Sequence, residues 1–119
     1  MLKSILTLTP DELDFAVAKA ERLFYMRDSD GQVFEFGDSG KVTAKAPPPS
    51  GRMFPYIPTR DWRQAGPIIE RLGISLQKIE HSWIADIGRE TMATGASPLE
   101  AAMRARVMAA FGREIDLSE

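Results

Sequence analysis

The chain has 119 residues, of which 44% are hydrophobic and 27% charged, a composition typical of one globular domain. It contains no cysteine, which excludes disulfide scaffolds, Cys-ligated zinc, iron–sulfur clusters and thiol nucleophiles. Its formal net charge of −2 indicates no general attraction to nucleic acids or membranes. No apolar run has the length of a membrane span, and no segment has the pattern of a signal peptide. We therefore expect a single cytoplasmic domain over residues 1–119.

Two segments have the same helix-start pattern: a hydroxyl residue, then proline, with glutamate three residues after the hydroxyl. They are residues 9–12 and 97–100, and both predict a capping box that satisfies the amides of the first helical turn. Apolar residues at helical spacing extend the first helix to about Phe24 and the last helix to Phe111, with Gly112 as its left-handed cap. One charge interrupts the apolar stripe of the last helix, Arg106, and we expect it to lie at the edge of the stripe or to pair with an acid.

Between these helices the hydrophobic pattern changes to a period of two, which is typical of strands. Residues 32–36 and 41–44 predict one hairpin, and residues 74–79 and 83–87 predict another with a tight turn near Glu80 and His81. Residues 92–96 are expected to link the second hairpin to the last helix.

The segment between the two hairpins combines prolines with a short helical pattern. Residues 45–58 hold five prolines, which predict an extended surface loop rather than a strand. A middle helix is expected after Thr59 as its cap, broken or kinked at Gly66 and Pro67 and ended by Gly73.

The order of these elements is helix, two strands, helix, two strands, helix. Because short hairpins rather than long crossovers join the strands, the sequence predicts an α+β fold, αββαββα, in which an antiparallel sheet of two hairpins packs with three helices. We interpret this fold as a single-domain sandwich with a Pro-rich surface loop at residues 45–58 and a short acidic tail at residues 114–119.

Two motifs that resemble catalytic or metal sites are better explained as turns. Residues 37–40 spell the Gly-Asp-Ser-Gly of chymotrypsin-like proteases, but the chain has about half the length of that double barrel and a single histidine. Residues 28–31 resemble part of a calcium loop, although Met26 and Gly37 stand where its outer acids belong. We expect no metal, no cofactor and no catalytic residue.

A hydrolase that uses His81 with Glu80 or Asp86 is the strongest enzymatic alternative, because an imidazole titrates near neutral pH. Adjacent residues of a strand point to opposite faces, so Glu80 is poorly placed to orient His81. The simpler interpretation is a solvent-exposed histidine at the tip of a hairpin.

A group of arginines and aromatic residues forms the best candidate binding surface, because guanidinium groups bind phosphate and aromatic rings stack on bases. The candidate residues are Arg52, Tyr56, Arg60, Trp62, Arg63 and Arg71. A structural explanation competes with this one: Asp61 and Glu70 can pair with the arginines, and Trp62 can pack on the sheet. Residues 55–60 also fit a PxxP docking motif, but Tyr56 and Ile57 are expected to anchor the loop instead.

Several segments, taken in order, resemble the NinX-like family of phage and prophage proteins over roughly two thirds of the chain. The matching segments are residues 13–20, 58–62, 66–71, 73–74, 83–85 and 95–104. The family in turn resembles phage "ABA sandwich" domains, which implies an α/β sandwich with a Trp-containing helix, a hairpin and a Pro-started last helix. The resemblance implies phage origin and transfers no catalytic residues. Residues 25–57 depart from the family pattern and are expected to form a longer hairpin and the proline loop.

Together these observations favour a non-enzymatic accessory protein of phage or prophage origin, in the bacterial cytoplasm. Its expected partner is another macromolecule, a protein rather than a nucleic acid, and neither a membrane nor a metal. Two alternatives stay open: a phosphate- or nucleic-acid-binding domain that uses the arginines of residues 52–71, and a small hydrolase that uses His81.

Overall fold

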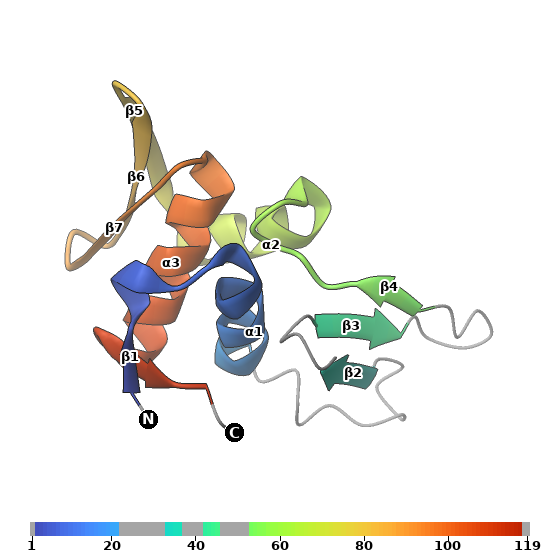
Figure 1. Cartoon of the computed structure of the whole chain (residues 1–119). Helices are drawn as coiled ribbons and strands as arrows, with labels where there is room; N and C mark the ends of the chain where they lie inside the picture. Colours follow the sequence, from blue (N-terminus) through green and yellow to red (C-terminus); the bar gives the residue numbers. More distant parts are fainter. Residues whose placement is uncertain (1, 22–32, 37–41, 46–52, 118–119) are drawn as a thin grey trace.

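The computed structural model describes residues 2–21, 33–36, 42–45 and 53–117 (Figure 1). Within these ranges it contains three α-helices and three antiparallel sheets, so the predicted α+β class is confirmed. The helices are α1 (Pro10–Ala20), α2 (Trp62–Leu72) and α3 (Pro98–Phe111), and a short 3-10 turn, η1 (Ile5–Thr7), precedes α1. The strands are β1 (Leu2–Ser4), β2 (Val33–Phe36), β3 (Val42–Lys45), β4 (Met53–Pro55), β5 (Ser75–Ile79), β6 (Ser82–Ile87), β7 (Thr91–Gly95) and β8 (Glu114–Asp116).

Helix α1 begins with the complete capping box that the sequence predicts. The Oγ1 of Thr9 accepts from the Glu12 amide at 3.2 Å, and the Glu12 carboxylate accepts from the Thr9 amide at 3.0 Å. The helix ends at Ala20 rather than Phe24, and the predicted last turn at residues 22–24 lies outside the described residues.

Helix α3 makes only half of its predicted capping box. The Ser97 Oγ accepts from the Glu100 amide at 3.1 Å, but the Glu100 carboxylate accepts from Arg104 instead of reaching back to Ser97. The helix ends at Phe111 as predicted. Its cap residue Gly112 has φ 84° and ψ −147°, which lies outside the left-handed helical region, so the predicted type of cap is wrong.

Helix α2 corrects two predictions about the middle of the chain. It runs as one helix through Gly66 and Pro67, so the predicted break is absent, and Pro67 inside the helix leaves one intrahelical hydrogen bond unmade. Its N-cap is Asp61, whose carboxylate accepts from the Arg63 amide at 2.9 Å, and not Thr59. The helix ends at Gly73 in the left-handed region, φ 64° and ψ 42°, as predicted.

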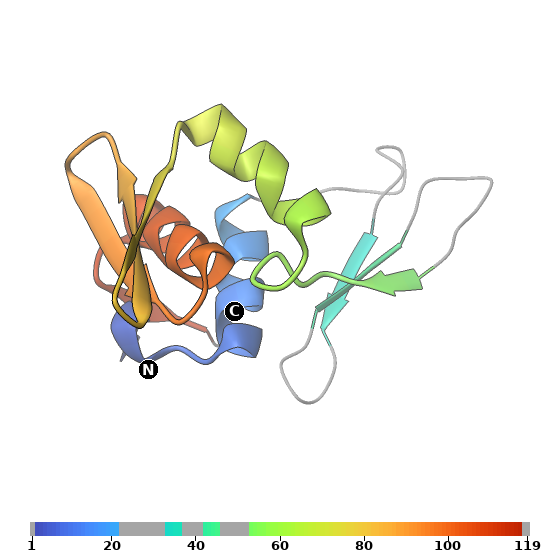
Figure 2. The same ribbon diagram turned by 90° about the horizontal axis from the view of Figure 1, so that it is seen from above.

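The centre of the molecule is α3, which packs on the β5–β6–β7 sheet with one face and on α1 with another (Figures 1 and 2). Small residues allow this close packing: Ala85 and Ala93 face α3 from the sheet, and α3 presents a run of buried alanines. The fully buried large side chains nearby are Ile5, Leu13, Val17, Met103 and Val107. The β2–β3–β4 sheet lies on the far side of α1, away from the other sheet (Figure 2).

The two predicted hairpins are present, and the second one has the predicted two-residue turn between Ile79 and Ser82. Four strands were not predicted: β1, β4, β7 and β8. Strand β7 replaces the expected linker at residues 92–96; its inward residues are Ala93 and Gly95, too small to give a hydrophobic alternation.

Strands β4 and β8 lie where the sequence indicated irregular structure, and β1, for which no element was predicted, pairs with β8. Strand β4 lies within the expected proline loop, and its Pro55 pairs with Thr43 at the edge of a sheet, where a missing amide is tolerated. Strand β8 lies in the expected acidic tail and pairs with β1, with Ile115 buried at 3% exposure.

Candidate functional site

The structure divides the predicted binding surface into buried, paired and exposed residues. Arg52 lies outside the described residues. Tyr56 is buried, Arg60 and Arg71 are half-exposed and bind carboxylates, and Trp62 and Arg63 are exposed. The surface that is open to a partner is therefore smaller than the sequence suggested.

Arg60 belongs to a cluster that joins α1 to the segment before α2. The buried carboxylate of Asp14 accepts from the Thr59 amide at 2.9 Å and from the Thr59 hydroxyl at 2.8 Å. The Nη2 of Arg60 contacts Asp14 at 3.0 Å and Asp11 at 2.9 Å. Burial raises the pKa of Asp14, and the hydrogen bonds from Thr59 and Arg60 offset this only in part.

Arg71 belongs to a second cluster, in which Glu21 at the end of α1 joins α2 and α3. The Nη2 of Arg71 contacts the two Glu21 oxygens at 2.8 and 2.6 Å, and the Nε of Arg106 contacts Glu21 at 2.7 Å. Arg106 therefore pairs with an acid, as expected. Burial acts to raise the pKa of Glu21, but the two arginines outweigh it and hold the pKa below its ordinary value.

The acids that pair with these arginines come from α1 rather than from their own helix. The sequence suggested Asp61 and Glu70 as partners. Asp61 does contact the Nε of Arg63 at 3.4 Å, but Arg60 and Arg71 bind Asp11, Asp14 and Glu21, which stand about 50 positions earlier in the chain.

The segment before α2 is fastened to the body of the molecule. Gln64 donates to the Pro55 carbonyl at 2.9 Å and accepts from the Ile57 amide at 2.6 Å. Tyr56 is 8% exposed, and burial raises the pKa of its hydroxyl. The prediction that Tyr56 anchors this segment is confirmed, and its ring is not available for stacking on a ligand.

Trp62 and Arg63 form the exposed part of the predicted surface. Trp62 is the first residue of α2 and is 56% exposed, so the expectation that it packs on the sheet is wrong. The Arg63 side chain is 92% exposed. Trp83, by contrast, packs against the core from β6, as predicted.

The residues of the hydrolase alternative are not brought together. His81 is exposed at the tip of the β5–β6 hairpin, where it lines an open hollow with Ile79, Glu80 and Ser82. Asp86 lies towards the other end of β6 and accepts from the Arg89 amide at 2.9 Å. Within the described ranges no three histidine, aspartate or glutamate residues are grouped as metal ligands.

Sequence reasoning missed Arg104, which is buried at 6% exposure in α3. Its guanidinium donates to the carbonyls of Ile5, Leu8 and Thr94 at 3.2, 3.1 and 2.6 Å. A fourth bond at 3.1 Å reaches Glu100. Arg104 thus fastens the N-terminal segment and β7 to α3. A charge between Met103 and Ala105 inside an apolar run is the only signal that the sequence offers for it.

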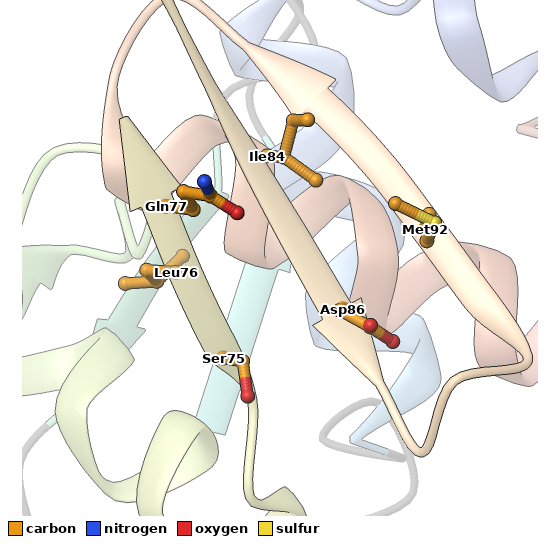
Figure 3. Close-up of a pocket in the computed structure, with 6 residues that line it drawn as sticks. All are labelled: Ser75, Leu76, Gln77, Ile84, Asp86 and Met92. Atoms are coloured by element: carbon orange, nitrogen blue, oxygen red, sulfur yellow. The ribbon is translucent and has the colours of Figure 1, made fainter. Parts of the chain in front are cut away.

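A second hollow lies on the β5–β6–β7 sheet, on the face turned away from α3 (Figure 3). Its lining residues are Ser75, Leu76, Gln77, Ile84, Asp86 and Met92. Met92 is 56% exposed, and Ile79, near the hairpin tip on the same face, is 37% exposed, so this face of the sheet shows apolar side chains to solvent.

A family model described as Bacteriophage P22, NinX matches residues 6–110 of this chain. The chain belongs to this family. The predicted resemblance to NinX-like phage proteins is thereby confirmed, and the protein is of phage type. No curated protein matches the chain. Among the described residues, no helix of this NinX-family chain combines the length and apolarity of a membrane span.

The range matched by the NinX model contains both charged clusters and the exposed pair at the start of α2. It also includes residues 25–57, which the resemblance had set apart. The NinX match assigns no catalytic residue, so the chemistry of the site rests on the side chains described above.

Proposed function

We propose that this NinX-family chain is a non-enzymatic accessory protein of a phage or prophage, which binds another protein in the cytoplasm of the bacterial host. The contact surface is formed by Trp62 and Arg63 at the start of α2, here called the α2 surface. The observation that carries this proposal is the 56% exposure of Trp62. Tryptophan and arginine are enriched at the energetic centres of protein interfaces, and a large exposed aromatic ring is unfavourable in water.

The α2 surface is held rigid by its surroundings, which favours binding because little side-chain and backbone freedom is lost. Asp61 caps the helix, and Gln64 fixes the preceding segment through two hydrogen bonds. Arg71 fastens the far end of α2 to Glu21. Trp62 is therefore presented on a supported helix rather than on a loop.

A protein partner is favoured over a nucleic acid because the neighbouring arginines are neutralised. Arg60 contacts two carboxylates and Arg71 contacts both oxygens of Glu21. Two arginines of the predicted surface, Arg60 and Arg71, thus have their own anions, which reduces the positive potential that phosphates require. Arg63, with a distant contact to Asp61, is the exception.

Comparing Trp62→Ala with Met92→Ala tests the proposal, because the two side chains are equally exposed, at 56%, on different elements. The wild-type chain is used as bait in a lysate of infected host cells, and the captured protein is then purified and titrated. We expect Trp62→Ala to weaken binding about 30-fold and Met92→Ala to leave it unchanged. Equal binding by Trp62→Ala and wild type, or loss through Met92→Ala instead, contradicts the proposal.

The nucleic-acid alternative has its own test, a titration of single-stranded DNA and RNA at increasing salt. We expect no salt-dependent affinity. Binding that weakens with salt and is lost in Arg63→Ala would replace the protein partner by a nucleic acid.

A further inference from the structure

The two edges of the β5–β6–β7 sheet differ in how their backbone groups are satisfied. At the β7 edge, the Thr94 carbonyl accepts from the Nη1 of the buried Arg104 at 2.6 Å. At the β5 edge, no backbone hydrogen bond of the described chain reaches residues 75–79 from outside the sheet. One outward carbonyl of the β7 edge is thus used within the molecule, whereas the described chain makes no such contact to the β5 edge.

The Arg104 contact also shows which groups of β5 point outward. The Thr94 carbonyl points away from β6, because it binds Arg104. Thr94 and Ile84 therefore form a pair without backbone hydrogen bonds between them. Because the pattern alternates along antiparallel strands, Ile84 bonds to Gln77 of β5. The neighbours of Gln77, which are Leu76 and Lys78, therefore direct their amides and carbonyls out of the sheet.

Strand β5 lacks most of the features that protect an edge strand from pairing. It contains no proline, its register with β6 is uninterrupted, and Lys78 is its one charge. The sheet face beside it is open to solvent and partly apolar: Ile79 and Met92 are exposed, and Ile84 and Met92 line the hollow on this face (Figure 3). Such an edge is a template for a further strand.

We infer that β5 pairs in antiparallel fashion with β5 of a second copy of this chain, about a two-fold axis at Gln77. In this register Leu76 lies opposite Lys78 of the second copy and exchanges both backbone bonds with it. Ser75 lies opposite Ile79, and the two Gln77 amides meet at the axis. No like charges stand opposite each other, and the two three-stranded sheets become one continuous sheet.

The two-fold symmetry of the pairing limits the assembly to two copies. In the dimer both β5 edges are used, and each outer edge is a β7 strand whose Thr94 carbonyl is already bound to Arg104. The interface uses the same surface on both copies and is closed by its symmetry, so it does not lead to a fibre. The α2 surface takes no part in this pairing.

A single engineered cysteine tests the register directly, because the natural chain has none. At the axis, two residues in a non-hydrogen-bonded pair have Cα atoms about 4.5 Å apart, a separation within the range of a disulfide. We expect Gln77→Cys to form a disulfide-linked dimer under mild oxidation. Thr94→Cys, exposed on the same face at the other edge, is the matched control and stays monomeric on a non-reducing gel.

Sedimentation equilibrium of the full chain tests the dimer without cross-linking. We expect a concentration-dependent dimer whose dissociation constant rises about fivefold in Gln77→Lys, since two lysines then meet at the axis. Mixing Gln77→Lys with Gln77→Glu restores association. A chain that is monomeric at all concentrations, a dimer unaffected by Gln77→Lys, or equal cross-linking of the two cysteine variants overturns the inference. None of these results bears on Trp62, so the two proposals fail separately.

Discussion

Gly95 is the residue at which the backbone of β7 approaches α3 most closely. A Cβ atom at this position would lie 2.5 Å from the Ala101 amide nitrogen and 2.9 Å from the Glu100 carbonyl carbon. Both are backbone atoms of the first turn of α3, which cannot move aside without displacing the helix. Glycine is required at position 95 because there is no room for a Cβ atom, and not because the backbone has an unusual conformation.

We expect Gly95→Ala to lower the free energy of unfolding by about 1–3 kcal/mol, because the added methyl group forces the sheet and α3 apart. Gly66→Ala is the control, and we expect it to raise the free energy of unfolding. Nothing lies within 4 Å of a Cβ at Gly66, and alanine in a helix stabilises by about 0.5–1 kcal/mol relative to glycine. Urea denaturation of both variants measures the difference, and a neutral Gly95→Ala would show that the contact between β7 and α3 is looser than described.

Glu21 determines a pH dependence of stability. Its pKa in the folded chain is below the ordinary value of 4.5, so the carboxylate contributes stability above that value and loses it as the pH falls through the folded pKa. We expect Glu21→Gln to reduce the free energy of unfolding by about 2 kcal/mol at pH 7 and by progressively less below pH about 4.5.

Thermal denaturation of the Glu21→Gln variant between pH 3 and 7 measures this dependence, with Glu70→Gln on the exposed side of α2 as the control. If Glu21→Gln lowered the free energy of unfolding by the same amount at every pH, the contacts between Glu21 and the two arginines would act through packing and not through charge.

At the scale of elements, the starts of α1 and α3 are the best predicted features and the strands the least. Thr9 and Ser97 act locally, through amides three residues away, so their sequence context is sufficient. Strand β7 is stabilised by pairing with β6 and by small residues that fit against α3. Small residues carry no hydrophobic periodicity, and the sequence therefore offered no signal for it.

The candidate site, too, could be predicted from the sequence only in part. The sequence identified Trp62 and the arginines by type, but their exposure depends on partners far along the chain. Asp14 binds Thr59 across 45 positions, and Glu21 binds Arg106 across 85. No spacing rule connects such pairs, so the charged clusters emerged only from the fold.

The Ser97 cap at the start of α3 allows a test at the scale of one element. We expect Ser97→Ala to destabilise the protein by about 1 kcal/mol, because the Glu100 amide loses its acceptor. Ser97→Asp, which keeps an acceptor and places a negative charge at the helix start, should retain most of the stability. Chemical denaturation followed by circular dichroism measures both, and equal losses in the two variants would contradict a capping role.

At the scale of the whole molecule, the two ends of the described chain close the fold together. Strand β1 pairs with β8 so that Leu2 lies opposite Asp116, and the Ile5 amide donates to the Arg113 carbonyl at 2.9 Å. Lys19 of α1 donates to the Asp116 carbonyl at 3.1 Å. The last strand is thus held by α1 as well as by β1, although its sequence is mostly acidic.

Ile115 provides the test of this closure. It is 3% exposed, whereas Leu2 in the partner strand is 60% exposed. We expect Ile115→Ala to cost about 2–4 kcal/mol and Leu2→Ala to have little effect, as measured by thermal melting. Similar small changes in both variants would show that the β1–β8 ladder is peripheral to the core.

The adjacency of Leu2 and Asp116 has a practical consequence. A polypeptide that enters this fold at β1 leaves it within one strand spacing, about 5 Å away. The described residues therefore begin and end side by side, so a recipient protein can carry residues 2–116 as an insert in a surface turn.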